Sequence, residues 1–262
     1  LSTSGIGGLL AATIGTSLIS INWRYAYVVL GAMFIVSCLL IFIFVPDMEE
    51  KEEVSHSAQI EKISFKEVIC NRNVIFLSLA MMLLNFIGHG NMSWLPTYLS
   101  EKFSVELKTI GTIMAFNAIF STIATMIVGV LLSKVFLGKE KHFIVISAML
   151  VSILFFMFPG TDSILGATLC NIAISILFIG PFIGIFTWPH KLLDPSIIGT
   201  AIGIINTGGM IGGFLGPMIL GKIVDANDGS FYVVYMVLSV ATIMCGLLVL
   251  GVKTNEASEL SK

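Results

Sequence analysis

The sequence predicts an all-α integral membrane protein, a bundle of eight membrane-spanning helices. Three observations predict this fold class. Hydrophobic residues make up 56% of the 262 residues and charged residues only 11%, against roughly 25% charged in ordinary soluble domains. The mean hydropathy of +0.99 leaves too little polar surface to cover a water-soluble fold. Apolar runs of about 20 residues, the length of a helix that crosses a bilayer, recur along the whole chain.

Eight runs have the composition of spans, and none of them contains Asp, Glu, Lys or Arg. Backbone polar groups in lipid must be paired within the segment, so each run is expected to be a helix and not a strand. The fifth run is short and is expected to extend into its flanks. In chain order the runs are Leu1–Ile21, Tyr25–Val45, Val74–Leu95, Thr109–Leu132, Phe143–Phe158, Ser163–Thr187, Ile197–Leu220 and Phe231–Gly251.

The loop Pro46–Asn73 is the main interruption between the runs. It mixes both charge signs, has no apolar run, and is expected to hold one short amphipathic helix around Ile60–Ile69. It divides the chain into two helices (1–45), a connector (46–73), six helices (74–252) and a tail (253–262). The other loops are short, which predicts that consecutive helices are antiparallel neighbours.

Lysines and arginines predict the orientation of the helices. Counted from the first loop, odd-numbered loops carry four of them, and even-numbered loops and the tail carry ten. Positive charge stays on the cytoplasmic side of a membrane. We therefore expect a multi-pass protein of the cell membrane with the connector and the C-terminal tail in the cytoplasm.

Charge and motif content exclude several other classes of protein. The net charge of −2 and the pI near 6.1 provide no basic surface for nucleic acid. The four cysteines show no CxxC or metal-site spacing, so no metal or cofactor is expected. No hydrolase, zinc-protease or phosphate-loop motif is present, and no acidic pair lies at membrane depth, so the sequence does not predict an enzyme.

Polar side chains inside a span are costly to place in lipid, so the few that occur are informative. The third run carries Asn85, His89 and Ser93 at a spacing of four, which places them on one face of a helix. His89 is the only histidine within the eight runs. It is either a substrate or proton contact lining a central cavity, or a histidine hydrogen-bonded to a neighbouring helix.

Asparagines in three other runs are further candidates for a polar lining. Asn117 lies in the fourth run, Asn171 in the sixth and Asn206 in the seventh. An amide both donates and accepts hydrogen bonds, so it can recognise a polar solute without a fixed charge. Asn117 and Asn171 fit either a watery cavity or a hydrogen bond between two helices.

The sixth and seventh runs are unusually rich in glycine and proline. Small residues let helices approach closely and slide, and proline removes a backbone donor. Two neighbouring interrupted helices indicate a binding region or a moving part in a transporter; simple tight packing is the alternative for the glycines. Thr187 and Trp188 close the sixth run, and Trp188 is either a binding residue or a membrane-interface anchor. The gating or packing candidates are Pro181, Gly199, Gly203, Gly208, Gly212, Gly216 and Pro217.

These segments resemble the major facilitator superfamily, whose members have twelve helices in two six-helix bundles joined by a long cytoplasmic loop. The segment Asn22–Gly31 (NWRYAYVVLG) resembles the Trp-Arg start of the family's sixth helix, and Gly199–Gly221 resembles its eleventh. The resemblance implies that residues 1–45 are the last two helices of the N-terminal bundle and residues 74–252 the complete C-terminal bundle. The first four helices would then be missing from this chain.

A loop after the fourth run resembles the family's G-x-x-x-D-R/K-x-G-R/K-R/K pattern in degenerate form. Ser133 replaces the acid, and the spacing to the second glycine is longer. The resemblance therefore does not carry over a gating salt bridge built on that acid. The matching residues are Gly129, Ser133, Lys134, Gly138, Lys139 and Lys141.

Within the superfamily, Ser93–Ser100 (SWLPTYLS) and Gly199–Gly216 resemble the anion:cation symporters. This implies a secondary transporter that moves a small organic anion, such as a sugar acid or another carboxylate, by alternating access, with H⁺ or Na⁺ as the coupling ion. It also implies that Thr187, Trp188 and Asn206 lie near the substrate. The family's arginine and acidic coupling residues belong to the missing half.

Three alternatives stay open. The chain could be a sensor or assembly subunit that does not transport, because packing alone accounts for its glycines. It could be an inactive truncated fragment, because half of a cavity cannot alternate. A membrane-embedded enzyme is the least favoured, because His89 is not accompanied by other converging ionisable groups.

Overall fold

The computed structural model describes residues 18, 22–44 and 65–254, and every regular element in these ranges is helical. Two helices are short, α4 (Phe65–Ile69) and α9 (Pro189–Leu192). The long helices are α3 (Trp23–Phe44), α5 (Arg72–Phe103), α6 (Leu107–Val130), α7 (Glu140–Met157), α8 (Ile164–Thr187), α10 (Ile198–Ala226) and α11 (Tyr232–Leu250).

Seven helices in the described ranges are long and apolar enough to cross a membrane, which confirms the predicted class of fold. They correspond to seven of the eight predicted spans. The remaining one, Leu1–Ile21, lies outside the described residues apart from Leu18. Helix α4 occupies the C-terminal half of the predicted Ile60–Ile69 helix.

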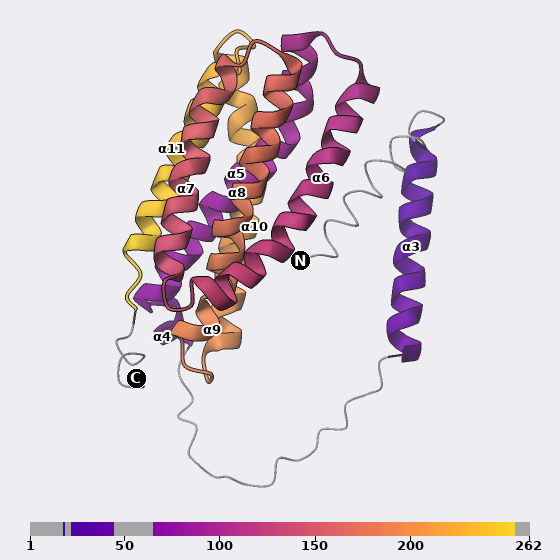
Figure 1. Cartoon of the computed structure of the whole chain (residues 1–262). Helices are drawn as coiled ribbons and strands as arrows, with labels where there is room; N and C mark the ends of the chain where they lie inside the picture. Colours follow the sequence, from indigo (N-terminus) through magenta and orange to yellow (C-terminus); the bar gives the residue numbers. More distant parts are fainter. Residues whose placement is uncertain (1–17, 19–21, 45–64, 255–262) are drawn as a thin grey trace.

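Six of the long helices, α5 to α8, α10 and α11, form one bundle, and α3 lies apart from it (Figure 1). Consecutive long helices in the bundle run in opposite directions, as the short loops predict. Helices far apart in the chain also pack together, above all α5 with α10 and α7 with α11.

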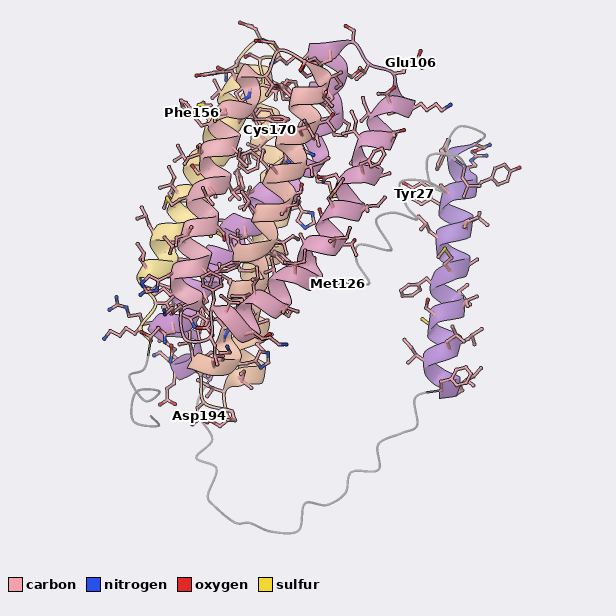
Figure 2. All side chains as sticks on the ribbon, viewed as in Figure 1. Tyr27, Glu106, Met126, Phe156, Cys170 and Asp194 are labelled. Atoms are coloured by element: carbon pink, nitrogen blue, oxygen red, sulfur yellow. The ribbon has the colours of Figure 1, made fainter. Side chains whose placement is uncertain are left out.

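Large apolar side chains cover the outside of the bundle. Met126 of α6 and Phe156 of α7 are each 60% exposed and point away from it (Figure 2). Along α3 fifteen large apolar side chains are exposed in the same way, and Ala26 is the one buried residue of this helix. Such a surface is unstable in water and matches a hydrocarbon solvent.

Several helices extend beyond their predicted ends. Helix α5 continues through Pro96 to Phe103 instead of ending at Leu95, and Ser104 in a left-handed conformation (φ 51°) terminates it. Helix α10 continues past Leu220 to Ala226, so that its last turns carry Lys222 and Asp225. Charged and polar turns at a helix end can reach the wet headgroup region, which is why an apolar run underestimates helix length.

The prolines do not interrupt their helices. Pro181 lies inside the continuous helix α8 and Pro217 inside α10, so the predicted breaks are absent. A proline removes one backbone donor but leaves the remaining ladder, and neighbouring helices can pair the freed groups. The indole Nε1 of Trp94 donates to the carbonyl of Pro217 itself at 2.9 Å, one turn beyond the Gly213 carbonyl that loses its helical donor.

Glycines set the contact between α5 and α10, which run in the same direction. A Cβ atom at Gly212 would overlap the Met82 carbonyl, and one at Gly216 would overlap the Phe86 carbonyl. Gly208 meets Ser78 in the same way, one turn earlier on both helices. The backbones therefore touch over three turns, and only glycine permits this distance.

The glycines of α10 do not all pack closely against a neighbouring helix. At Gly199 and Gly203 an added Cβ would meet nothing within 4 Å. Both lie in the first turns of α10 at exposed positions. The close packing expected of them is therefore absent within the described part of the chain, and the tight contact begins at Gly208.

We expect Gly212→Ala to lower the stability of the purified protein by about 1–3 kcal/mol, because the new methyl group has no room beside the Met82 carbonyl. Thermal unfolding in detergent measures the loss. Gly203→Ala is the matched control on the same helix, and it should not destabilise the protein. Equal stability of the two variants would contradict the close approach of α5 and α10.

Candidate functional site

Three of the predicted site residues lie along the contact between α5 and α10. A Cβ at Gly209 would stand 2.9 Å from the Asn85 amide nitrogen, and one at Gly213 would stand 2.9 Å from His89 Cδ2. Asn206 precedes Gly209 by about one helical turn on α10. We call Asn85, His89 and Asn206 the polar seam.

The polar seam contains hydrogen-bonding groups that are not paired with any described residue. His89 is exposed, and Asn85 and Asn206 are half-buried. The Asn85 amide donates to the Met81 carbonyl at 3.0 Å, one turn back on its own helix, which leaves its oxygen available. Neither His89 nor Asn206 makes a side-chain hydrogen bond to any residue in the described ranges. For His89, the bond to a neighbouring helix that the sequence left open is therefore not observed there.

Two other predicted asparagines lie elsewhere, inside the bundle. Asn171 of α8 is only 1% exposed. Neither polar atom of its amide has a hydrogen-bond partner among the described residues, and the same holds for the buried oxygen of Asn117 on α6. Asn91 of α5, which the sequence analysis overlooked, carries a third such oxygen. Its signal was present, because it is an asparagine inside the third run, between His89 and Ser93.

Trp188 is buried and Thr187 is exposed at the end of α8. Trp188 is 3% exposed and packs in a core cluster with Val74 and Ile205. The hydroxyl of Thr187 donates to the Ile183 carbonyl of its own helix at 2.9 Å. Trp188 thus packs within the bundle at this end of α8, and the position near the substrate that the family resemblance implies for it stays a prediction.

The degenerate loop motif adopts a structure without an ion pair at Ser133. The helix passes from α6 through Gly129 into a π-helical turn, Leu131–Val135, where the Ser133 hydroxyl donates to the Val130 carbonyl at 3.1 Å. Gly138 has φ 76°, a left-handed conformation that favours glycine. Lys134 and Lys139 have no ion-pair partner in the described ranges, and Lys141 donates to the Val252 carbonyl at 2.9 Å.

An ion pair that sequence reasoning missed lies beside this loop. Glu140 begins α7 and is 7% exposed, and Lys191 of α9 donates to its Oε1. The pair ties α7 to the segment that joins α8 to α10. A carboxylate also gains from the exposed N–H groups of the helix start. The two residues are 51 positions apart, so spacing alone could not pair them.

Asp194 lies at the same end of the bundle, in the turn before α10 (Figure 2). The hydroxyl of Ser196 donates to its carboxylate at 2.6 Å, and the backbone N–H of Ser196 donates at 2.8 Å. These two bonds lower the pKa of Asp194 below its ordinary value. A lowered pKa means that the bonds stabilise this turn at neutral pH and are lost as the pH falls through that pKa.

The opposite end of the bundle holds a cavity of about 300 Å³ between α5 and the two neighbouring loops. The ammonium of Lys102 lines it and donates to the Pro159 carbonyl at 2.6 Å and to the Tyr98 hydroxyl at 3.2 Å. These bonds connect Lys102, near the end of α5, to the turn that follows α7. The lining residues are Tyr98, Glu101, Lys102, Pro159, Gly229, Ser230, Phe231 and Tyr232.

The fold defines a multi-pass helical membrane protein with a hydrogen-bonding surface along two parallel helices. Among the described residues, no group of three or more His, Cys, Asp or Glu side chains could hold a metal ion. The chain belongs to the Major Facilitator Superfamily, whose model matches residues 1–217. The sequence resemblance to this transporter family is thereby confirmed.

Individual relatives agree with the family. The chain is 22% identical over 242 residues to the hexuronate transporter of Bacillus subtilis (strain 168), covering 86% of this chain and 57% of that protein. It therefore spans little more than half the length of this relative. The fold resembles two crystal structures of a bacterial homologue of the human lysosomal transporter Spinster.

Both Spinster-homologue structures are inward-facing. The unoccupied form gives a TM-score of 0.60 at 16% identity, covering 95% of this chain and 67% of that one. The occupied form gives a TM-score of 0.57 at 16% identity, covering 94% and 63%. At this identity the likeness supports the helical arrangement alone.

We expect Lys191→Ala to destabilise the bundle by about 1–2 kcal/mol, because it leaves the nearly buried Glu140 carboxylate without its charged partner. Chemical or thermal unfolding of the purified protein measures the change. Adding Glu140→Gln to Lys191→Ala should recover part of the loss. Lys139→Ala serves as a control with little effect, and strictly additive effects of the two pair substitutions would argue against the ion pair.

Proposed function

We propose that this chain is part of a secondary transporter that moves a small organic anion, a sugar acid or another carboxylate, by alternating access. The observation that carries the proposal is the match to a hexuronate transporter over 86% of the chain, within a family of transporters. A polar organic solute also agrees with the polar seam, where the half-buried amides of Asn85 and Asn206 and the exposed His89 lie along the contact of α5 with α10.

The seam suits the hydroxyl groups of such a solute. Each amide donates and accepts hydrogen bonds, and the imidazole of His89 can do both. These directional bonds select a hydroxylated solute without binding it too strongly to release. The seam contains no lysine or arginine, so the positive charge that pairs with a carboxylate would come from helices outside this bundle.

The bundle acts as one half of the transporter. Residues 74–252 form the C-terminal bundle, and residues 1–45 contribute the last two helices of the other one, joined through the 46–73 connector. The second bundle would close over the polar seam, and rocking of the two bundles would expose the solute to each side in turn. H⁺ or Na⁺ is the coupling ion, bound by the other bundle.

The orientation follows from the distribution of lysine and arginine. We place the connector and the C-terminal tail in the cytoplasm, in the cell membrane. The Glu140–Lys191 pair then lies at the cytoplasmic end of the bundle and Glu106 at the outer end, where Figure 2 shows it at the start of α6.

Uptake into proteoliposomes tests the function. The intact transporter should take up labelled galacturonate or glucuronate, faster with an inward H⁺ or Na⁺ gradient. Asn206→Ala should lower kcat/KM about tenfold, the effect of one lost hydrogen bond to the solute. Asn227→Ala is the matched control, because this asparagine bonds to the Ile223 carbonyl at the far end of the same helix. Equal uptake by Asn206→Ala and the wild type would remove Asn206 from the site.

Cysteine labelling tests the orientation. With exposed Cys38 and Cys70 changed to serine, we expect Glu106→Cys to react with a membrane-impermeant maleimide in intact cells. Thr254→Cys, an exposed position beyond α11, should react only after permeabilisation, because positive-inside orientation places it in the cytoplasm. The reverse pattern would invert the topology.

A further inference from the structure

Three asparagine amides of the bundle have buried polar atoms without a hydrogen-bond partner among the described residues. We call Asn91, Asn117 and Asn171 the asparagine triad. The unpaired atoms are the amide oxygens of all three residues and the amide nitrogen of Asn171, none of which bonds to a described residue. Buried polar atoms are nearly always hydrogen-bonded, because an unpaired one loses its bonds to water without replacement. Three in neighbouring helices therefore call for a partner other than the described residues.

The members of the triad lie within one apolar cluster. Along its own helix, each is next to buried members of that cluster at helical spacing. These neighbours are Ile87 and Leu95 for Asn91, Ile110 and Ile113 for Asn117, and Ala167 and Ile174 for Asn171. The three helices that carry them contact one another. The unpaired atoms of the triad are thus shielded among α5, α6 and α8, although Asn171 is buried and Asn91 and Asn117 are half-buried as whole residues.

Contacts between helices indicate where the triad lies along the length of the bundle. Gly88 of α5 packs against the ring of Phe178 on α8, which lies two turns from Asn171 on the same face. Asn91 lies about one turn from Gly88 in the same direction along the bundle. Asn117 lies on the buried stripe of α6 formed by Ile110, Ile113 and Ala124. Figure 2 labels Cys170, directly before Asn171, well inside the half of the bundle where α8 begins.

We propose that the asparagine triad is an internal binding site for hydroxyl groups, supplied either by bound water or by a hydroxylated solute. A hydroxyl donates one hydrogen bond and accepts two, which complements the unpaired oxygens and the N–H groups of the triad. The apolar walls strengthen such bonds, because water from bulk does not compete for them.

Hydrogen bonding between helices does not account for the triad. Asparagines that hold helices together bond to one another or to backbone carbonyls, as Ser152 and Ser239 do between α7 and α11, where their hydroxyls lie 2.9 Å apart. The unpaired atoms of the triad make no such bond, and packing alone would be served better by leucine. Binding of a solute at the triad rests on the proposed transport of a sugar acid, whereas binding of water there does not.

Radiolytic labelling of the intact transporter in nanodiscs tests for bound hydroxyls. X-ray radiolysis of an internal water oxidises the sulfur atoms beside it. Met114 and Cys170 pack against the cluster that holds the triad, and fully buried Cys245 belongs to a different cluster and serves as the control. We expect oxidation of Met114 and Cys170 in the wild type, and a fall toward the level of Cys245 in Asn171→Leu, which keeps the branching at Cγ and the number of side-chain heavy atoms but removes the hydrogen-bonding groups.

Affinity measurements distinguish the source of the hydroxyl. Galacturonate is compared with cyclohexanecarboxylate, a carboxylate of similar size without hydroxyls. If solute hydroxyls reach the triad, Asn171→Leu should weaken galacturonate binding about tenfold or more and leave cyclohexanecarboxylate unchanged. If water occupies the triad, labelling falls and both affinities stay the same. Either result supports the site.

Asn117→Leu repeats both measurements from another helix, in case Asn171→Leu does not fold. Labelling of Met114 and Cys170 that is unchanged in every variant that folds, together with unchanged affinity for galacturonate, would overturn the proposal. A protein that binds no sugar acid but loses labelling in the variants would refute the proposed substrate and keep the hydration site.

Discussion

The backbone contact between α5 and α10 is the constraint on which the rest of the bundle depends. Ser78, Met82 and Phe86 present carbonyl groups to α10 at every turn, and Gly208, Gly212 and Gly216 leave room for them. In lipid no hydrophobic effect draws two apolar helices together, so close packing must supply the attraction. Once these backbones touch, Trp94 can reach the Pro217 carbonyl and Asn85 and His89 are held beside Gly209 and Gly213.

This contact also divides the polar residues into two populations. Those on the open edge of the α5–α10 pair form the polar seam, where a solute can meet free amides. Those on α5, α6 and α8 form the asparagine triad, whose unpaired amide atoms are buried. One apolar sequence pattern therefore yields two environments, and the difference comes from which side of α5 each residue occupies.

The fold class could be predicted because the length of an apolar run and the need to pair its backbone are local properties. The end of α5 could not, because whether a helix continues through Pro96 depends on its surroundings. The sequence also placed Asn85, Asn117, Asn171 and Asn206 in a single lining, since nothing local separates an open face from a closed one. Glu140 and Lys191 were missed for the related reason that their partnership exists only after α7 and α9 have packed.

The parallel pairing of α5 with α10 has a consequence for how the protein is made. The Ser78 hydroxyl bonds to the carbonyl of Ile204, a residue 126 positions later in the chain. A ribosome adding roughly 5–20 residues per second needs several seconds to synthesise that interval. During this time α5 lies in the membrane without α10, so the face that presents its carbonyl groups is not yet covered. Biogenesis of this half of the molecule must therefore protect an early helix until a late one arrives.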